Sequence, residues 1–85
     1  MTFADAALEQ AVRSHVHKPA GGLTTTDVDT LHHLVAPALG IVSLEGLQAC
    51  ASLLTARLRG NAIVDLGPLH ELVNLGDLYL NNNEV

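Results

Sequence analysis

The histidines are the first residues in this sequence whose type and spacing could do chemistry. Five are present, and four of them form two clusters, His15 with His17 and His32 with His33. A structural zinc site takes four ligands from Cys, His, Asp or Glu. Residues two apart in a helix do not share a face, so His15 and His17 cannot bind one ion from a regular helix. No carboxylate pattern completes a set, and we interpret the clusters as solvated helix-end residues, with a histidine metal site kept as an alternative.

A nucleophilic thiol is the second chemistry to consider. Cys50 is the only cysteine, so no disulfide forms within the chain. A catalytic thiol needs a partner base and an activating environment. The repeat described below instead puts Cys50 at a leucine position, which predicts a small buried hydrophobe. The segments "RLRG" and "AGG" lack the glycine spacing and the lysine of a phosphate loop. We find no catalytic arrangement and predict a protein that is not an enzyme and needs no cofactor.

Composition limits the partners that the chain can bind. The 85 residues are 48% hydrophobic and 15% charged, which predicts one small globular domain. A formal net charge of −5 argues against nucleic acid, because phosphate binding needs a basic surface. No apolar run is long enough to cross a bilayer, so we expect no membrane insertion. No signal peptide is visible near the start, which predicts a cytoplasmic protein for the chain as given and otherwise leaves localisation unknown.

An internal repeat organises the second half of the chain. Residues 41–62 ("IVSLEGLQACASLLTARLRGNA") align with residues 63–84 ("IVDLGPLHELVNLGDLYLNNNE"), and the apolar positions coincide. The spacing fits the leucine-rich repeat pattern L-x-x-L-x-L-x-x-N-x-L. A degenerate copy precedes them, with Leu39 in place of the asparagine. The two clear copies are Leu53, Ala56, Leu58, Asn61, Ile63 and Leu75, Leu78, Leu80, Asn83, Val85.

The physical chemistry of each repeat position predicts its structure. Within L-x-L the period is two, so each repeat contributes a short strand with its leucines facing inward. Parallel strands need a crossover, which "SLEGL" and "DLGPL" supply as turns or 3₁₀ segments on the convex side. Asn61 and Asn83 follow the strands, where an amide can satisfy exposed backbone groups and form a ladder. Leu39 cannot do so, which makes the first coil atypical.

The segment 1–38 does not repeat and is predicted to be helical. Leu8, Val12 and Val16 recur at every fourth position, with Asp5 as the N-cap, and "KPAGG" at 18–22 ends this helix. In "LTTTDV" a threonine and an aspartate form a capping box, which predicts a second helix from about residue 25 to residue 33. Repeat arrays need a terminal cap. We therefore divide the chain into a helical N-terminal cap at 1–38 and about two repeat coils at 39–85, open at the C-terminal end.

Four segments carry a resemblance to a known family. They are "FADAALEQAV", "LTTTDVDTL", the step Gly40–Ile41 and "NAIVDLGPLHELVNLGDLYLNNNEV". Together they resemble the internalin-type leucine-rich repeat proteins of bacteria, in which a helical cap precedes repeats of this same length. The resemblance implies an α/β repeat fold, a short solenoid with a helical N-terminal cap and a small parallel sheet on its concave face. It also implies a protein partner on that face, and the family is typically secreted.

Alternation along the strands predicts which side chains would meet that partner. Arginine and tyrosine are favoured anchors of protein interfaces. An ordinary polar surface, with Arg57 paired to Asp77 across the sheet, would explain the same residues. His33, Val35 and Pro37 occupy the corresponding positions of the first coil. The predicted partner-binding residues are Thr55, Arg57, Arg59, Asp77, Tyr79 and Asn81.

Two further alternatives remain for the function. The chain could be the non-binding, capped start of a longer repeat array, with the binding surface in later repeats. A parallel sheet that stops at Leu78–Leu80 also has an unpaired edge. We therefore predict self-association through the uncapped C-terminal edge, or fraying of the last residues.

Overall fold

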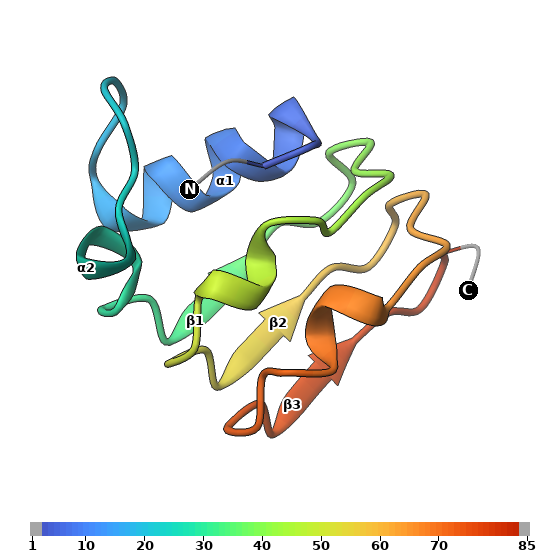
Figure 1. Cartoon of the computed structure of the whole chain (residues 1–85). Helices are drawn as coiled ribbons and strands as arrows, with labels where there is room; N and C mark the ends of the chain where they lie inside the picture. The colour runs from blue at the N-terminus through green and yellow to red at the C-terminus, as the bar shows by residue number, and fades with distance from the viewer. Residues whose placement is uncertain (1–2, 84–85) are drawn as a thin grey trace.

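The computed structural model of the chain describes residues 3–83 and shows two helices followed by three parallel strands (Figure 1). The strands begin at His33, Thr55 and Asp77, at the same position of successive repeats, and lie in the order β1-β2-β3. The small parallel sheet predicted from the L-x-L segments is therefore confirmed. The elements are α1 (Ala6–Val16), α2 (Thr25–Val28), β1 (His33–Val35), β2 (Thr55–Arg57) and β3 (Asp77–Tyr79).

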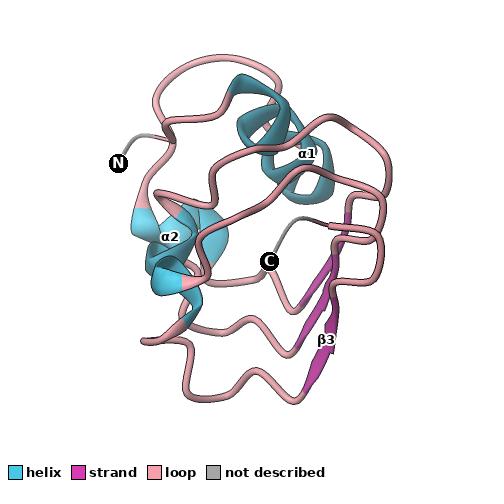
Figure 2. Cartoon of the chain, turned by 90° about the vertical axis from the view of Figure 1, so that its right-hand side faces the viewer, coloured by secondary structure: helices cyan, strands magenta, loops and turns pink. Residues whose placement is uncertain are grey.

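The crossovers between the strands run on the opposite side of each coil from the sheet (Figure 2). They contain the 3₁₀ helices η1 (Leu47–Ala49) and η2 (Gly67–Leu69), as the short Gly- and Pro-containing segments predicted. Asp65 accepts a hydrogen bond from the backbone N–H of Gly67 at 2.8 Å, which fixes the turn into η2. Each repeat is thus a strand, a turn and a 3₁₀ segment.

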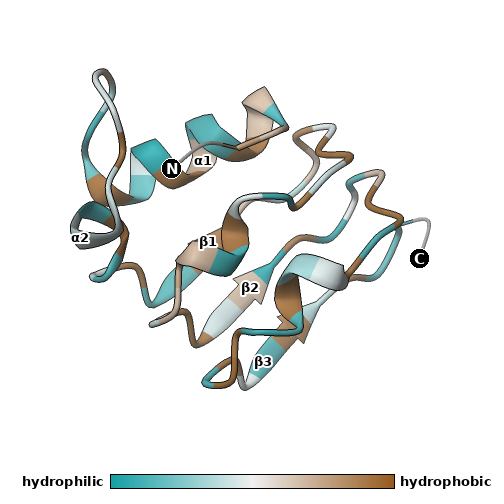
Figure 3. Cartoon of the chain, in the orientation of Figure 1, coloured by the Kyte–Doolittle hydropathy of each residue, from teal (hydrophilic) through white to brown (hydrophobic). Residues whose placement is uncertain are grey.

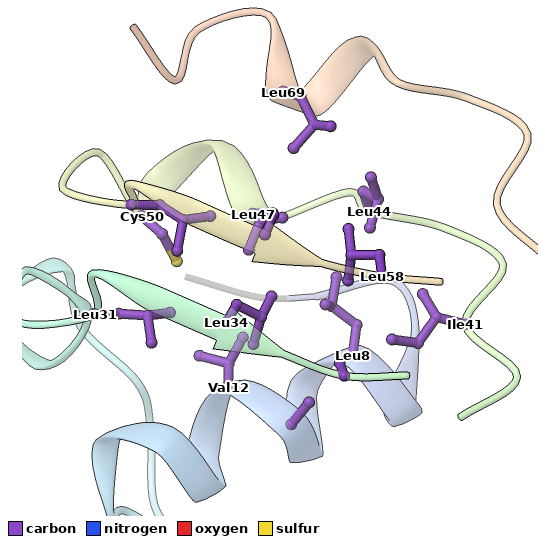
Figure 4. Close-up of a cluster of buried hydrophobic side chains, with 14 of the residues drawn as sticks. Leu8, Val12, Leu31, Leu34, Ile41, Leu44, Leu47, Cys50, Leu58 and Leu69 are labelled. Carbon is purple, nitrogen blue, oxygen red and sulfur yellow. The ribbon is translucent and has the colours of Figure 1, made fainter. Parts of the chain in front are cut away.

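The core lies between the sheet, the crossovers and α1. Leu34 in β1 and Leu58 just after β2 are fully buried, as are Leu8 and Val12 of α1. Figure 4 shows Leu8 and Val12 pointing toward Leu34, so the cap helix closes the first coil. Colouring by hydropathy shows that α1 carries both hydrophilic and hydrophobic residues, as a helix with one buried face requires (Figure 3). No helix within residues 3–83 has the length and apolar character to cross a membrane.

Asp5 joins the cap helix to the first coil. It is the N-cap of α1, as predicted, and its Oδ1 accepts from the backbone N–H groups of Ala7 at 2.9 Å and Leu8 at 3.3 Å. Its Oδ2 accepts from Val42 at 2.8 Å and Ser43 at 3.3 Å. Partial burial raises the pKa of Asp5, but the backbone N–H donors outweigh this effect and hold the pKa below its usual value. One carboxylate therefore clamps two segments that lie far apart in the sequence.

The second helix is shorter than predicted. We expected it to run to about residue 33, but α2 ends at Val28, with Asp29 as its C-cap. The cause lies in the sheet, where the carbonyl of His32 accepts hydrogen bonds from the N–H groups of Leu54 at 2.7 Å and Thr55 at 3.0 Å. These bonds require an extended backbone where the pattern predicted helix. The predicted capping box at the start of α2 is present.

His15 is also different from its prediction as a solvated helix-end residue. Its Nε2 accepts a hydrogen bond from the backbone N–H of Val35 at 3.1 Å. Its Nδ1 lies 2.6 Å from the carbonyl of Ala11, to which it donates, because the accepting Nε2 carries no proton. The imidazole therefore links α1 to the outer edge of β1. The helical pattern around His15 could not reveal a partner in a strand so distant along the chain.

The last coil is less buried than the first two. Leu78 of β3 is 42% exposed, whereas Leu34 and Ala56, at the same position of the two earlier coils, are fully buried. The difference arises because, within residues 3–83, each of these earlier positions has a following coil packed over it and Leu78 does not. The repeat position of Val85, and any fraying of the last residues, lie outside the described residues.

Candidate functional site

The outward side of the sheet carries two short rows of side chains, which we call the concave face. The strand register sets the rows, because residues paired across parallel strands lie side by side. Leu34, Ala56 and Leu78 occupy the alternate, inward positions. Arg59 and Asn81 continue the face beyond the strand ends, and both are exposed. The first row is His33, Thr55 and Asp77, and the second row is Val35, Arg57 and Tyr79.

The second row contains a contact between a cation and an aromatic ring. The guanidinium carbon of Arg57 lies 5.2 Å from the centroid of the Tyr79 ring, a cation–π distance. Tyr79 remains 45% exposed and Val35 48% exposed. The exposed side chains of Val35 and Tyr79 therefore flank the guanidinium of Arg57, one on each side.

Arg57 does not pair with Asp77 in the described part of the chain, so the ion pair considered with the ordinary-surface alternative is wrong. The register places Asp77 opposite Thr55 and places Tyr79 opposite Arg57. The ion pairs of residues 3–83 join Arg13 to Glu9 and Lys18 to Asp27, and none involves Arg57. The ring of Tyr79 thus lies beside Arg57, where the alternative explanation placed the carboxylate of Asp77.

Thr55 is mostly buried and offers little surface to a partner, so its role as a contact residue stays a prediction. Only 8% of it is exposed, although alternation places it on the concave face. The reason is its position on the middle strand, where His33 flanks it on one side and Asp77 on the other. Asp77 is exposed at the margin of the sheet and stays accessible.

Asn61 follows β2 along the chain. Its side chain makes a set of buried hydrogen bonds behind the concave face. Its Oδ1 accepts from the N–H groups of Leu39 at 2.9 Å and Ile41 at 3.1 Å. Its Nδ2 donates to the carbonyls of Ala36 at 2.8 Å and Leu58 at 2.9 Å. Since only 7% of Asn61 is exposed, these bonds replace water that cannot enter.

Asn83 repeats these contacts one coil later. Its Oδ1 accepts from Ile63 at 3.1 Å, and its Nδ2 donates to the carbonyls of Leu58 at 2.7 Å and Leu80 at 3.0 Å. The Leu58 carbonyl thus accepts from both Asn61 and Asn83. The two amides connect successive coils and hold the strand exits in register, which fixes the spacing of the concave rows.

Other possible sites have a structural explanation. Cys50 is fully buried, and burial raises the pKa of its thiol to about 11, so the thiol is neutral at physiological pH. Among residues 3–83, no group of three or more His, Cys, Asp or Glu side chains is placed to hold a metal ion. A hollow on the surface of α1 is lined in part by Arg13, which is already bonded to Glu9 at 3.0 Å. None of these features offers a nucleophile with a base beside it.

No family model and no curated protein matches the chain. Solved structures do match it. An internalin (InlF) from Listeria monocytogenes is 30% identical with a TM-score of 0.91, and the match covers 95% of this chain and 24% of that one. Internalin C2 from the same organism is 34% identical with a TM-score of 0.90 over 95% of this chain and 37% of that one. The CBM51-2 and INT domains of Clostridium perfringens ZmpB are 28% identical with a TM-score of 0.83, over 92% and 16% of the two chains.

These likenesses support an internalin-type leucine-rich repeat fold, as the sequence predicted. The chain spans about a quarter of the length of the first of these structures and just over a third of the second.

Proposed function

We propose that this chain, which has an internalin-type leucine-rich repeat fold, binds a protein partner on its concave face. Leucine-rich repeat solenoids generally serve as protein-interaction modules and bind along the concave surface. The observation that carries the proposal is the stack of Arg57 on Tyr79, with Val35 exposed beside it. Arginine and tyrosine are the residue types that most often anchor such interfaces.

The stack also lowers the entropic cost of binding. A long side chain that becomes immobile at an interface costs about 0.5–1.5 kcal/mol in lost rotamer freedom. Tyr79 already restrains the guanidinium of Arg57 in the unbound chain, at 5.2 Å from its ring. Arg59, Asp77 and Asn81 surround the stack and, being exposed, would form the polar rim of the interface. This arrangement supports binding rather than catalysis as the role of the face.

A double substitution on the stack tests the proposal. A partner is first selected from displayed protein fragments, and its affinity is then measured for the chain and its variants. Tyr79→Ala combined with Arg57→Ala should weaken binding by about thirtyfold or more, because truncation of even one anchor residue costs about 2 kcal/mol. The melting temperature should not fall, because both side chains lie on the surface.

Val64→Ala is the matched control, since Val64 is 56% exposed and lies outside the strands. It should leave the affinity unchanged. A partner that tolerates the double substitution but loses affinity on Val64→Ala would contradict the concave-face proposal.

The exposure of the last coil favours a second candidate function. A further coil or another copy of the chain would pack against it. Leu78 is 42% exposed, and Leu75 and Leu80 are only partly buried against the core. Apolar groups next to a sheet edge promote pairing with a further strand. We infer that this coil is covered in the working protein, either by a further repeat or by self-association.

Light scattering after size-exclusion chromatography tests the second candidate. The 85-residue chain should self-associate as its concentration rises, and Leu78→Lys should return it to a monomer. Val64→Lys adds the same charge to an exposed valine elsewhere and should not change the mass. Appending a second copy of residues 63–84 should cover the coil and remove the self-association. A chain that stays monomeric up to millimolar concentration would contradict the self-association proposal.

A further inference from the structure

Among the Lys and Arg side chains of residues 3–83, those without an ion pair lie on the concave face. The chain has four Lys and Arg residues against nine Asp and Glu residues. Two of the four are held in the cap, Arg13 by Glu9 at 3.0 Å and Lys18 by Asp27 at 2.8 Å. The other two are Arg57 and Arg59, and within residues 3–83 neither forms an ion pair. An acidic chain thus keeps its two unneutralised arginines on the surface proposed to bind.

The contact with Tyr79 leaves Arg57 able to bind a carboxylate. The guanidinium carries five N–H donors in one plane, so a contact with a single aromatic ring leaves donors that point away from that ring. A carboxylate can meet two of these donors in a bidentate pair, which is among the strongest charge-assisted hydrogen bonds. Tyr79 therefore orients the guanidinium without consuming its hydrogen-bonding capacity.

The spacing of the two arginines matches an extended ligand. Arg57 and Arg59 occupy alternate positions, and the backbone remains in sheet-type pairing, because the carbonyl of Arg59 accepts from Ala38 at 3.0 Å. Alternate positions along a strand lie about 6.6 Å apart and return to the same side. An extended peptide with acidic residues at alternate positions places its carboxylates at this same interval.

The neighbouring side chains set the extent of the acidic segment. Asp77 lies one row away from Arg57 and would repel a further carboxylate at that end. The net charge of −5 also opposes a long polyanion. Exposed charges farther apart than about 8–10 Å are screened at physiological salt, so a short motif responds mainly to the two arginines. The exposed side chains of Val35 and Tyr79 add apolar contact beside the cation.

We propose that the concave face recognises an extended acidic peptide segment, with two carboxylates at alternate positions and an apolar residue beside them. One carboxylate pairs with Arg57, the other pairs with Arg59, and the apolar residue covers Val35. This inference rests on the proposed protein-binding function and names the chemical class of its partner.

Three short synthetic peptides of equal length test the class of partner. They share a valine and a polar background and differ at two alternate positions, which carry two Glu, two Gln or two Lys residues. Each is titrated into the ¹⁵N-labelled full chain at low salt. The Glu peptide should shift the amide signals of Arg57, Arg59 and Tyr79 and bind about tenfold more tightly than the Gln peptide. The difference should shrink at high salt, and the Lys peptide should bind most weakly.

Two variants separate the concave face from overall charge. Arg57→Gln combined with Arg59→Gln should abolish the preference for the Glu peptide. Lys18→Gln also removes a positive charge, but from the cap, where Lys18 pairs with Asp27. This variant should keep the preference.

The other outcomes overturn the inference in distinguishable ways. Equal binding of the Glu and Gln peptides at the concave face would reject the acidic partner and leave the protein-binding function standing. A short single-stranded oligonucleotide that binds the same residues more tightly than the Glu peptide would replace the acidic peptide with a phosphate backbone. If no probe shifts these amides and the selected partner also tolerates substitution of the stack, the proposed function itself fails.

Discussion

Asn61→Ala is expected to lower the free energy of unfolding by about 3 kcal/mol, the largest effect of any single substitution that we predict here. The side chain of Asn61 satisfies two backbone N–H groups and two carbonyls, and it is 7% exposed. Removing it leaves the buried N–H of Ile41 and the buried carbonyl of Ala36 without this partner, at about 1–3 kcal/mol for each group, whereas the Leu58 carbonyl still accepts from Asn83. Urea denaturation followed by circular dichroism measures the loss.

Asn83→Ala is the matched control for this prediction. Asn83 makes the equivalent bonds to Ile63, Leu58 and Leu80, but it is only partly buried. Water can replace a lost partner at such a site, so the loss should be about 1 kcal/mol. Equal losses at the two positions would show that burial does not determine the strength of the ladder.

The periodic part of the fold was predictable because its causes are local. Leucines at every second position specify the strands, and the constant length of the repeat specifies how they stack. Asp5 and Thr24 cap helices through bonds to residues two or three positions away. Such contacts can be inferred from spacing alone.

The contacts that the sequence did not reveal join segments that are distant along the chain. Asp5 reaches Val42, and His15 reaches Val35. The residue types on both sides of these bonds are ordinary, so no pattern indicates that they meet. The early end of α2 also has a long-range cause. The carbonyl of His32 accepts hydrogen bonds from the backbone N–H groups of Leu54 and Thr55, at the start of β2.

The concave face was predictable from the sequence only in part. Alternation predicted the side of the sheet on which Arg57 and Tyr79 lie, but it did not reveal that Tyr79, and not Asp77, is the neighbour of Arg57 on β3. The repeat could have predicted this neighbour, because equivalent positions of successive repeats lie side by side in a parallel solenoid. Arg57 and Tyr79 are equivalent positions. Thr55 shows the limit of alternation, which predicts a direction and not the cover that adjacent strands provide.

Asp5→Ala is expected to lower the free energy of unfolding by about 2 kcal/mol at pH 7, as the sum of two lost contributions. Loss of an N-cap costs about 1 kcal/mol, and loss of the hydrogen bonds that Val42 and Ser43 donate to Oδ2 adds a second contribution of similar size. The loss should exceed that of Asp27→Ala, which removes only an exposed capping box and its ion pair to Lys18. Thermal or urea denaturation of the two variants gives the comparison.

The contribution of Asp5 should also depend on pH in a defined direction. Its pKa is lowered in the folded chain, so the unfolded state binds more protons in the range where the group titrates. The stabilisation is therefore complete above the unfolded pKa of about 3.9 and is lost as the pH falls through the lower folded value. The difference in unfolding free energy between the wild-type chain and Asp5→Ala should shrink below about pH 4. If it stays constant from neutral pH to acid, the carboxylate is not the group that joins the cap to the first coil.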